Sequence, residues 1–443
     1  MCFCLNSSNM YSRDEFLYQK ISAGIPALKF DIPPEYKDID LKEGRNGLLY
    51  SPYAPGHSLL SVPFTYLSKN WKNKLFGSKI YTSFVTAVIL ILITFQISKN
   101  FFSIHSAAAF VFSCYYSTML GVYSKTFFSE LSAALFFLLI FFEYKADCNN
   151  LNAEKEYKTG KAVKYGLYIA FLILIKTVNI LFLPLFGIYY YNLLKKQPRK
   201  ILICSLVILL AFAAIAAGIT GFYNYYRFGD FFESGYMKTH PSGTAHGFIT
   251  PFHIGFYGLL FSAGKSVFLY CPLLILFFFI RKKLPENFKS PYSFAATIFF
   301  FHIILFSKWL YWAGGITVWG PRFLVPAILP MLFCVMFAYN SISLKWKIIF
   351  WDLLIIGIMF NIAALIFDYR LFIPCTDWDN ELRLYFYPHE SPIVRGLQYI
   401  MPGAIKNARH DVIFAGILII VPLTLVYFIA QALLEKAEQI QKE

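Results

Sequence analysis

The sequence contains few charged residues, and few of these are acids. Only 15% of its 443 residues are charged, and 25 Asp and Glu stand against 40 Lys and Arg, for a formal net charge of +15. The chain is 58% hydrophobic with a mean hydropathy of +0.54, whereas a soluble domain is about 45–50% apolar. Much of the Lys and Arg lies in short clusters between apolar runs, so the positive charge does not indicate a nucleic-acid partner.

The sequence also lacks a cysteine pattern for a metal site and lacks a complete nucleotide-binding loop. Cys2 and Cys4 have no partner pair, and several other cysteines stand inside apolar runs, where cysteine packs as a small apolar residue. Gly264-Lys265-Ser266 resembles part of a phosphate-binding loop, but Leu259 stands where the first glycine should be. No strand is predicted before it, so we exclude an NTPase.

Long apolar blocks make up most of the chain. A helical span needs roughly 20 such residues, and the blocks are continuous rather than alternating, which argues against a β-barrel. Basic clusters on alternate loops place those loops in the cytoplasm. The sequence predicts an all-α, polytopic helical membrane protein with about 11 spans, at 80–97, 104–121, 127–143, 164–178, 180–194, 201–221, 263–280, 293–310, 323–340, 348–366 and 412–433.

Three regions follow from this pattern. Residues 1–79 form a long outer loop that carries acids and an interfacial helix at Leu59–Leu67, residues 80–433 form the transmembrane domain, and residues 434–443 form a cytoplasmic tail. Because basic clusters flank Tyr165–Leu194 on both sides, this run is expected to cross twice. Export of the first region requires an apolar span before it, so we expect the native gene to encode one upstream.

Acidic residues are placed at the edge of the predicted membrane. The apolar run Tyr123–Tyr144 carries Glu130 near its start, and a charge within the hydrocarbon costs roughly 2.5–3.5 kcal/mol, less near the interface. Asp14 and Glu15 belong to a second segment expected on the same face. These acids either reach water harmlessly, with Ser12 and Glu15 capping a helix, or they form a site in which Asp14 or Glu15 is a general base or an ion ligand.

Cationic residues accompany the acids on the predicted outer loops. Lys125 precedes Glu130, Arg227 lies in an aromatic loop, and Lys265 and Arg322 stand at the ends of predicted spans. Guanidinium and ammonium groups at these positions suit a lipid phosphate. The alternative for Arg322 is capping of neighbouring carbonyls, and the alternative for the aromatic loop is a membrane-interface belt.

Taken in order, these segments resemble bacterial membrane glycosyltransferases of the C-type superfamily, which depend on a lipid carrier and are related to protein mannosyltransferases and the aminoarabinose transferase of lipid A. The order and the shared side of the segments carry the resemblance, rather than any one of them. The matching segments are Ser12–Tyr18, Tyr50–Pro63, Tyr123–Glu130, Gly258–Lys265 and Trp319–Pro326.

The resemblance implies an inverting transferase at the outer face of the inner (cell) membrane. It would take a sugar from a polyprenyl-phosphate donor and attach it to a lipid, glycan or protein acceptor of the cell envelope. Membrane lipids would be its other partners, and a divalent cation such as Mg or Mn its candidate cofactor. Asp14 and Glu130 correspond to the two acids of the family. Lys265 and Arg322 correspond to phosphate contacts. Tyr53 stands where relatives often carry a lysine.

Two other classes compete with an enzyme. A transporter or lipid flippase would show polar residues in mid-span and repeats in the two halves, and the sequence shows neither clearly. The departure at Tyr53 leaves a non-catalytic relative of the transferases as the other alternative. The sugar and the acceptor do not follow from the sequence.

Overall fold

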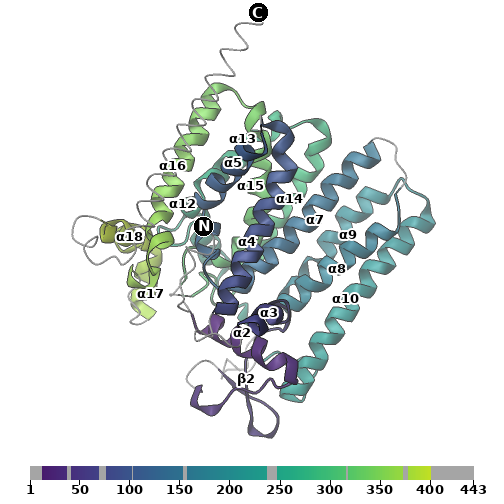
Figure 1. Ribbon diagram of the computed structural model, residues 1–443, viewed down its shortest axis with the longest axis vertical. Helices are drawn as coiled ribbons and strands as arrows, with labels where there is room; N and C mark the ends of the chain where they lie inside the picture. Colours follow the sequence, from purple (N-terminus) through teal and green to yellow (C-terminus); the bar gives the residue numbers. More distant parts are fainter. Residues whose placement is uncertain are drawn as a thin grey trace, which may run out of the picture.

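The computed structural model describes residues 12–36, 41–68, 76–101, 103–152, 157–236, 247–315, 318–372 and 378–400. Long helices stand side by side in a bundle, and the N-terminal segment lies across one end of it (Figure 1). The all-α class predicted from the sequence is confirmed for these residues. Within the described ranges, six helices are long and apolar enough to cross a membrane, which agrees with a membrane protein.

Residues 12–36 and 41–68 form a cap at one end of the bundle (Figure 1). We name this region the N-terminal cap. Two 12-residue helices pack against each other in it, and a two-stranded antiparallel hairpin pairs Lys42 with Tyr50. The elements of the cap are α2 (Arg13–Gly24), β1 (Lys42–Glu43), β2 (Leu49–Tyr50) and α3 (Gly56–Leu67).

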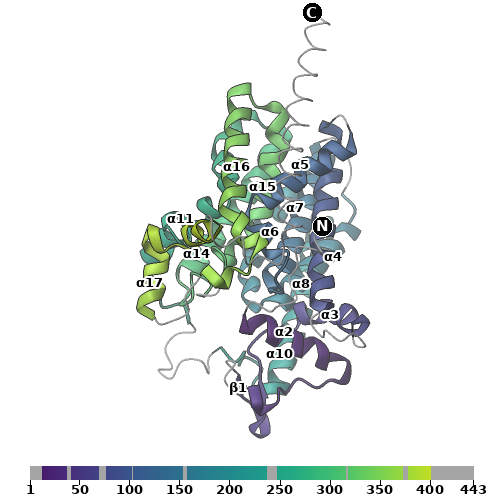
Figure 2. The same ribbon diagram turned by 60° about the vertical axis from the view of Figure 1, so that its left-hand side comes forward.

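The bundle continues from the cap through two sets of helices. The first set is α4 (Phe76–Ile97), α5 (Ile104–Tyr116), α6 (Met119–Tyr123), α7 (Ser129–Asn152), α8 (Gly160–Ile175), α9 (Leu183–Leu194) and α10 (Arg199–Phe228). The second set is α11 (Phe252–Phe261), α12 (Val267–Tyr270), α13 (Phe277–Ile280), α14 (Lys289–Ser307), α15 (Val325–Ala338), α16 (Leu344–Ile366), α17 (Trp378–Phe386) and α18 (Pro392–Ile400). Figure 2 shows α17 beside α11 at one flank of the bundle, where Tyr257 and Phe386 stack.

Burial separates the central helix from the peripheral ones. The span that contains α15 is 83% buried, and it packs against α7 and α14, whereas the span of α10 is only 22% buried. Both sequences are strongly apolar. A helix that is apolar on every side is buried in the core or faces lipid, so α15 forms the core and α10 presents its apolar surface outward.

The chain reverses between α8 and α9, because the ring of Tyr190 near the end of α9 contacts that of Tyr165 near the start of α8. Lys161 and Lys164 near the start of α8 pair with Asp147 and Glu143 near the end of α7. The opposite end of α8 reaches the start of α7 through Lys176. Helices α7 and α8 are therefore antiparallel, and Lys176 lies at the cap end of the bundle.

The expected span at 263–280 is not one continuous helix. It consists of a loop at Ser262–Ser266, the short helices α12 and α13, and a 3₁₀ segment (Pro272–Leu276) between them. Pro272 lacks the amide that a continuing helix requires, and its ring clashes with the preceding turn. Cys271 leaves helical geometry before it, at φ −141° and ψ 68°. The expected span at 412–433 and the tail at 434–443 lie outside the described residues.

Candidate functional site

Arg322 joins two acids that are far apart in the sequence. Its Nη1 lies 2.7 Å from Oδ2 of Asp14, and its Nε lies 3.4 Å from Oε1 of Glu130. The second contact is within ion-pair distance but outside hydrogen-bond geometry. The guanidinium also lies over the rings of Phe128 and Phe323, each at 4.9 Å. The structure thus brings together Asp14 from the cap, Glu130 from α7 and Arg322 from the segment before α15; we call these three residues the acid cluster.

A tight turn before α15 presents the guanidinium to the acids. Gly320 has φ +67°, and a Cβ there would lie 2.9 Å from both Met119 and Tyr270. A glycine is therefore required by conformation and by space. Pro321 follows, and Arg322 begins the 3₁₀ turn that leads into the helix. The Gly-Pro-Arg order thus fixes where the arginine side chain starts.

Lys176 supplies a second cation to Glu130. Its Nζ lies 2.6 Å from Oε1 of Glu130, and it lies 4.7 Å from the centre of the Phe323 ring. The residue ends α8 with extended backbone angles, φ −146° and ψ 117°. Glu130 is 2% exposed, so two cations offset the cost of burying its charge.

Glu15 connects α2 to the start of α7. The predicted capping box is confirmed: the amide of Ser12 donates to Oε2 of Glu15 at 2.8 Å, and the amide of Glu15 donates to the Ser12 hydroxyl. The other oxygen, Oε1, accepts a hydrogen bond from the amide of Phe127. Glu15 is 1% exposed. It therefore holds Asp14, its neighbour in sequence, next to the residues that precede Glu130.

Tyr53 contacts the acid rather than an open space. Its hydroxyl donates to Oδ1 of Asp14 at 2.6 Å, and its ring stacks on Tyr18 at 4.8 Å. Burial, with the Asp14 carboxylate beside it, raises the pKa of Tyr53 well above its usual value. The phenol therefore stays protonated and remains a donor. Arg322 and Tyr53 together occupy both oxygens of Asp14.

Exposure distinguishes the two acids of the cluster. The side chain of Asp14 is 20% exposed and that of Arg322 is 14% exposed, whereas that of Glu130 is 2% exposed. A general base must reach the proton that it removes. Asp14 is consequently the acid that a substrate can approach, and Glu130 lies behind the guanidinium.

Lys265 holds the turn that leads to Arg322. Its Nζ donates to the carbonyl oxygens of Gly315, Val318 and Gly320 at 3.2, 3.0 and 3.3 Å, and it lies 5.2 Å from the Tyr385 ring centre. The residue is fully buried. These described bonds go to main-chain oxygens, so Lys265 stabilises the position of the guanidinium from behind.

Arg227 plays a corresponding part for the turn that carries Tyr53. Its Nη1 donates to the carbonyl of Ser51 and, at 3.4 Å, to that of Tyr53, and its Nη2 donates to Oδ1 of Asn224 at 2.8 Å. Arg227 is 1% exposed. It fastens the turn to the end of α10.

Lys125 also donates to main-chain oxygens. Its Nζ bonds the carbonyl oxygens of Leu365 and Phe367 at 3.3 and 2.7 Å. Burial lowers the pKa of Lys125 to about 7. The lysine connects the segment before Glu130 to the end of α16.

Polar contacts attach the cap to the helices of the bundle. The hydroxyl of Tyr18 donates to Ser129 at 3.0 Å. Nδ1 of His57 shares a hydrogen bond of 2.9 Å with Ser132, whose hydroxyl also meets that of Tyr81 at 2.7 Å. Serine at the first and fourth positions of α7 thus docks the cap beside the acid cluster.

Within the described ranges, no group of three or more His, Cys, Asp or Glu side chains is arranged to hold a metal ion. The acid cluster carries a guanidinium between its two carboxylates. Chemically, it offers a partly exposed carboxylate that can accept a proton and a cation that can pair with a phosphate.

The sequence missed Lys176 as a member of this site. Its signal was a lone lysine within the apolar run Ile169–Phe182. A cation inside an apolar run requires an acid partner. Glu130 was an acid to which no ion-pair partner had been assigned. From the sequence, Lys176 was expected only near the turn between the spans 164–178 and 180–194.

Comparison of the chain with protein-family models, with curated proteins and with solved structures finds no match.

Proposed function

We propose that the chain is a membrane glycosyltransferase that moves a sugar from a polyprenyl-phosphate donor to a lipid, glycan or protein acceptor. The observation that supports this most is the pairing of Asp14, the partly exposed acid, with Arg322 at the cap end of an apolar helical bundle. A lipid-linked donor would bring its phosphate to this level of the membrane while its polyprenyl chain stays among the helices or in lipid. The fuller proposal has about 11 spans, with the site on the outer face of the cell membrane.

In the proposed step, Asp14 accepts the proton of the acceptor hydroxyl as its oxygen attacks C1 of the sugar. The bond between C1 and the phosphate oxygen breaks, and the phosphate leaves with the electron pair. Arg322 stabilises the charge that develops on the leaving phosphate. The anomeric configuration inverts because attack and departure occur on opposite faces.

The ion pair between Arg322 and Asp14 provides a way to couple donor binding to the base. Arg322 pairs with Asp14 at 2.7 Å, and a phosphate offers the guanidinium a bidentate partner of higher charge. Donor binding would draw Arg322 away from Asp14 and leave the carboxylate able to accept a proton. Glu130, held by Lys176, would keep the guanidinium oriented throughout.

The remaining candidates act at a distance from the reacting atoms in this proposal. Lys265 and Arg227 position the turns that carry Arg322 and Tyr53, and Lys125 fixes the segment before Glu130. Glu15 positions Asp14. A divalent cation such as Mg or Mn, if used, would arrive with the donor phosphate and find Asp14 as an oxygen ligand.

Mass spectrometry of membrane glycolipids and glycoproteins tests the proposal in cells. Membranes with the chain are compared with membranes without it and with membranes that carry the Asp14→Asn variant at equal protein level. We expect at least one glycosylated species that requires the chain and disappears in both other samples. Identical profiles in all three samples would remove the transferase assignment.

A non-catalytic relative of the transferases is the second candidate. Both oxygens of Asp14 are engaged, one by Tyr53 and one by Arg322, as in a purely structural pair. That candidate predicts that donor analogues leave the pair intact. Binding of a polyprenyl phosphate that is weakened by Arg322→Lys would support the transferase instead.

A further inference from the structure

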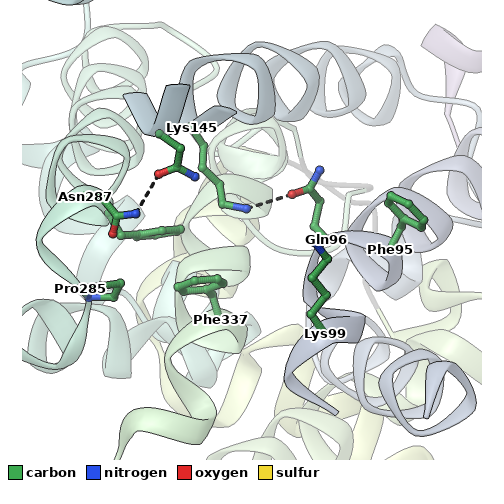
Figure 3. A pocket seen from close by; sticks show the side chains of 9 residues that line it. Phe95, Gln96, Lys99, Lys145, Pro285, Asn287 and Phe337 are labelled. Carbon is green, nitrogen blue, oxygen red and sulfur yellow. Dashed lines mark hydrogen bonds between the residues drawn. The ribbon is translucent and has the colours of Figure 1, made fainter. Parts of the chain in front are cut away.

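A second polar site lies at the end of the bundle opposite the acid cluster. A pocket of about 360 Å³ opens between the ends of α4, α7 and α15 and the start of α14. Glu130 and Lys145 stand 15 residues apart on α7, which is about 22 Å along the helix axis. Figure 3 shows the lining side chains, which are Phe95, Gln96, Lys99, Lys145, Asn149, Pro285, Asn287, Phe288 and Phe337.

Lys145 forms the cationic floor of this pocket. It is 9% exposed, and its Nζ donates to Oε1 of Gln96 at 2.9 Å, as Figure 3 shows. Three rings surround the ammonium, with centroids at 6.0 Å for Phe288, 5.1 Å for Phe333 and 5.4 Å for Phe337. The rings desolvate the ammonium, which strengthens its attraction for an anion.

The acids nearest to Lys145 on its own helix are used elsewhere. Glu143 pairs with Lys164, and Asp147 pairs with Lys161 and accepts from Tyr165. Among the described residues, neither Lys145 nor Lys99 lies within ion-pair distance of a carboxylate. The pocket therefore has two cations whose charge no described acid balances.

An apolar strip on α4 leads to the rim of the pocket. Phe84, Ile91 and Phe95 are 53%, 66% and 72% exposed, and spacings of seven and four residues place them on one face of the helix. Phe95 lines the pocket itself. An acyl chain can lie along this strip while its headgroup reaches the two lysines.

Amide groups complete the polar rim. Asn287 donates to Oδ1 of Asn149 at 3.0 Å (Figure 3), and Gln96 faces Lys145 from α4. Rotation of these amides would direct donors to a bound oxyanion without moving the backbone. A phosphate diester has one negative charge and several acceptor oxygens, which matches two ammonium groups and amide donors.

We propose that this pocket binds the phosphate headgroup of an anionic phospholipid, with an acyl chain on the exposed strip of α4. The occupant is a lipid rather than a free anion because the cationic floor and the apolar strip are continuous through Phe95. The site is separate from the acid cluster, so this proposal does not depend on the proposed transferase activity.

Native mass spectrometry of the full chain, titrated with phosphatidylglycerol or phosphatidylcholine in detergent, tests the proposal. We expect preferential retention of phosphatidylglycerol. Lys145→Met and Lys99→Met should each weaken its binding about fivefold, since a basic residue near an anionic lipid contributes about that factor. Lys200→Met, which removes an exposed lysine outside the pocket, should leave binding unchanged.

The proposal is overturned by equal retention of the two lipids, by an unchanged phosphatidylglycerol affinity in both single variants Lys99→Met and Lys145→Met, or by equal weakening in Lys200→Met. If Lys145→Met fails to fold, Lys99→Met decides alone, because that side chain is exposed. A parallel titration with inorganic phosphate distinguishes the source of the anion. Displacement of the lipid by phosphate at equal concentration would assign the site to a free anion instead.

Discussion

Arg322 forms ion pairs with two acids at once, the partly exposed Asp14 and the buried Glu130. Removing one partner of a buried ion pair leaves an uncompensated charge, which costs about 3–5 kcal/mol. Lys176 shares Glu130 with the arginine. The buried acid therefore keeps one cation when the guanidinium is altered, whereas Asp14 does not.

Replacing Arg322 with lysine keeps the charge and removes the planar fork. Since an ammonium cannot bind phosphate bidentately, we expect the KM for a polyprenyl-phosphate donor to rise about tenfold, a change of about 1.4 kcal/mol, with a smaller effect on thermal unfolding. Arg199→Lys, in the exposed first turn of α10, is the matched control. A KM equal to that of the unaltered protein would show that Arg322 does not hold the donor.

His57 makes the cap sensitive to acid. Burial lowers the pKa of His57 to about 3, whereas the unfolded chain has a value near 6.5. Between these values the unfolded state binds a proton that the folded state does not, so stability falls as the pH drops from about 6.5 towards 3. At pH 5 the loss is about 2 kcal/mol, from about 1.4 kcal/mol per pH unit.

Thermal unfolding at pH 7 and pH 5 measures this loss. His57→Asn keeps a polar group near Ser132 and removes the titration, so its melting temperature should change less between the two pH values. His253→Asn, in α11 and exposed, should retain the full pH dependence. Equal pH dependence in His57→Asn and the unaltered protein would contradict the assignment.

The sequence predicts a site residue where its charge is costly at the membrane edge, and it does not predict contacts with main-chain atoms. Asp14, Glu130 and Arg322 stood out because charge at a membrane edge is costly, and the structure places all three together. The contacts of Lys265 and Arg227 with main-chain oxygens could not be foreseen. Sequence separates cations from apolar residues but does not show which buried carbonyls lack a donor.

At the scale of elements, the close approach of α3 to α8 positions Lys176 at the cap end of the bundle. A Cβ on Gly56 would lie 2.4 Å from the carbonyl carbon of Leu174 and 2.6 Å from the amide nitrogen of Ile175. Both atoms are main chain, so an added methyl group forces the helices apart. Lys176 follows directly, and its contact with Glu130 depends on this spacing.

Gly56→Ala should therefore destabilise the protein by about 1–3 kcal/mol, as overpacking commonly does, and should lower transfer by displacing Lys176. Gly187→Ala is the control, because nothing lies within 4 Å of its Cβ position in α9 and alanine favours a helix. Melting temperature and transfer rate are measured for both variants. Similar behaviour of the two would show that the α3–α8 contact is not close in solution.

Element type was predictable where apolar runs are long, as in α4, α10 and α16. The break within 263–280 was missed because hydropathy averages over Pro272 and over the loop that contains Gly264. A Cβ on Gly264 would lie 2.0 Å from the carbonyl oxygen of Leu384. This contact joins the loop to α17, more than a hundred residues away, so the local composition around Gly264 cannot predict it.

At the scale of the whole molecule, the two ends of the bundle differ in character. One end carries the cap and the acid cluster, and the other carries basic connectors such as Lys195–Lys200 (Figure 1). Basic loops remain in the cytoplasm, so the proposal places the cap outside. The 30 residues of α10 separate the two ends by about 45 Å.

Single-cysteine labelling in a cysteine-free background tests this orientation. Asp230→Cys, exposed at the cap end of α10, should react with an impermeant thiol reagent in intact cells. Lys196→Cys, exposed at the other end, should react only after permeabilisation. The opposite pattern would place the acid cluster in the cytoplasm and exclude an external donor.

The most direct test of the central claim is the rate at which purified protein releases polyprenyl phosphate from polyprenyl-phosphate-linked hexoses in the presence of a membrane extract. The unaltered protein should release it, and Asp14→Asn should do so about 10²–10⁴-fold more slowly, as expected for loss of a general base. Asp230→Asn, at an exposed acid outside the cluster, should match the unaltered protein in rate and in melting temperature. Asp14→Asn should remain folded, because Glu130 still pairs with Arg322. An unchanged rate in Asp14→Asn would contradict the account.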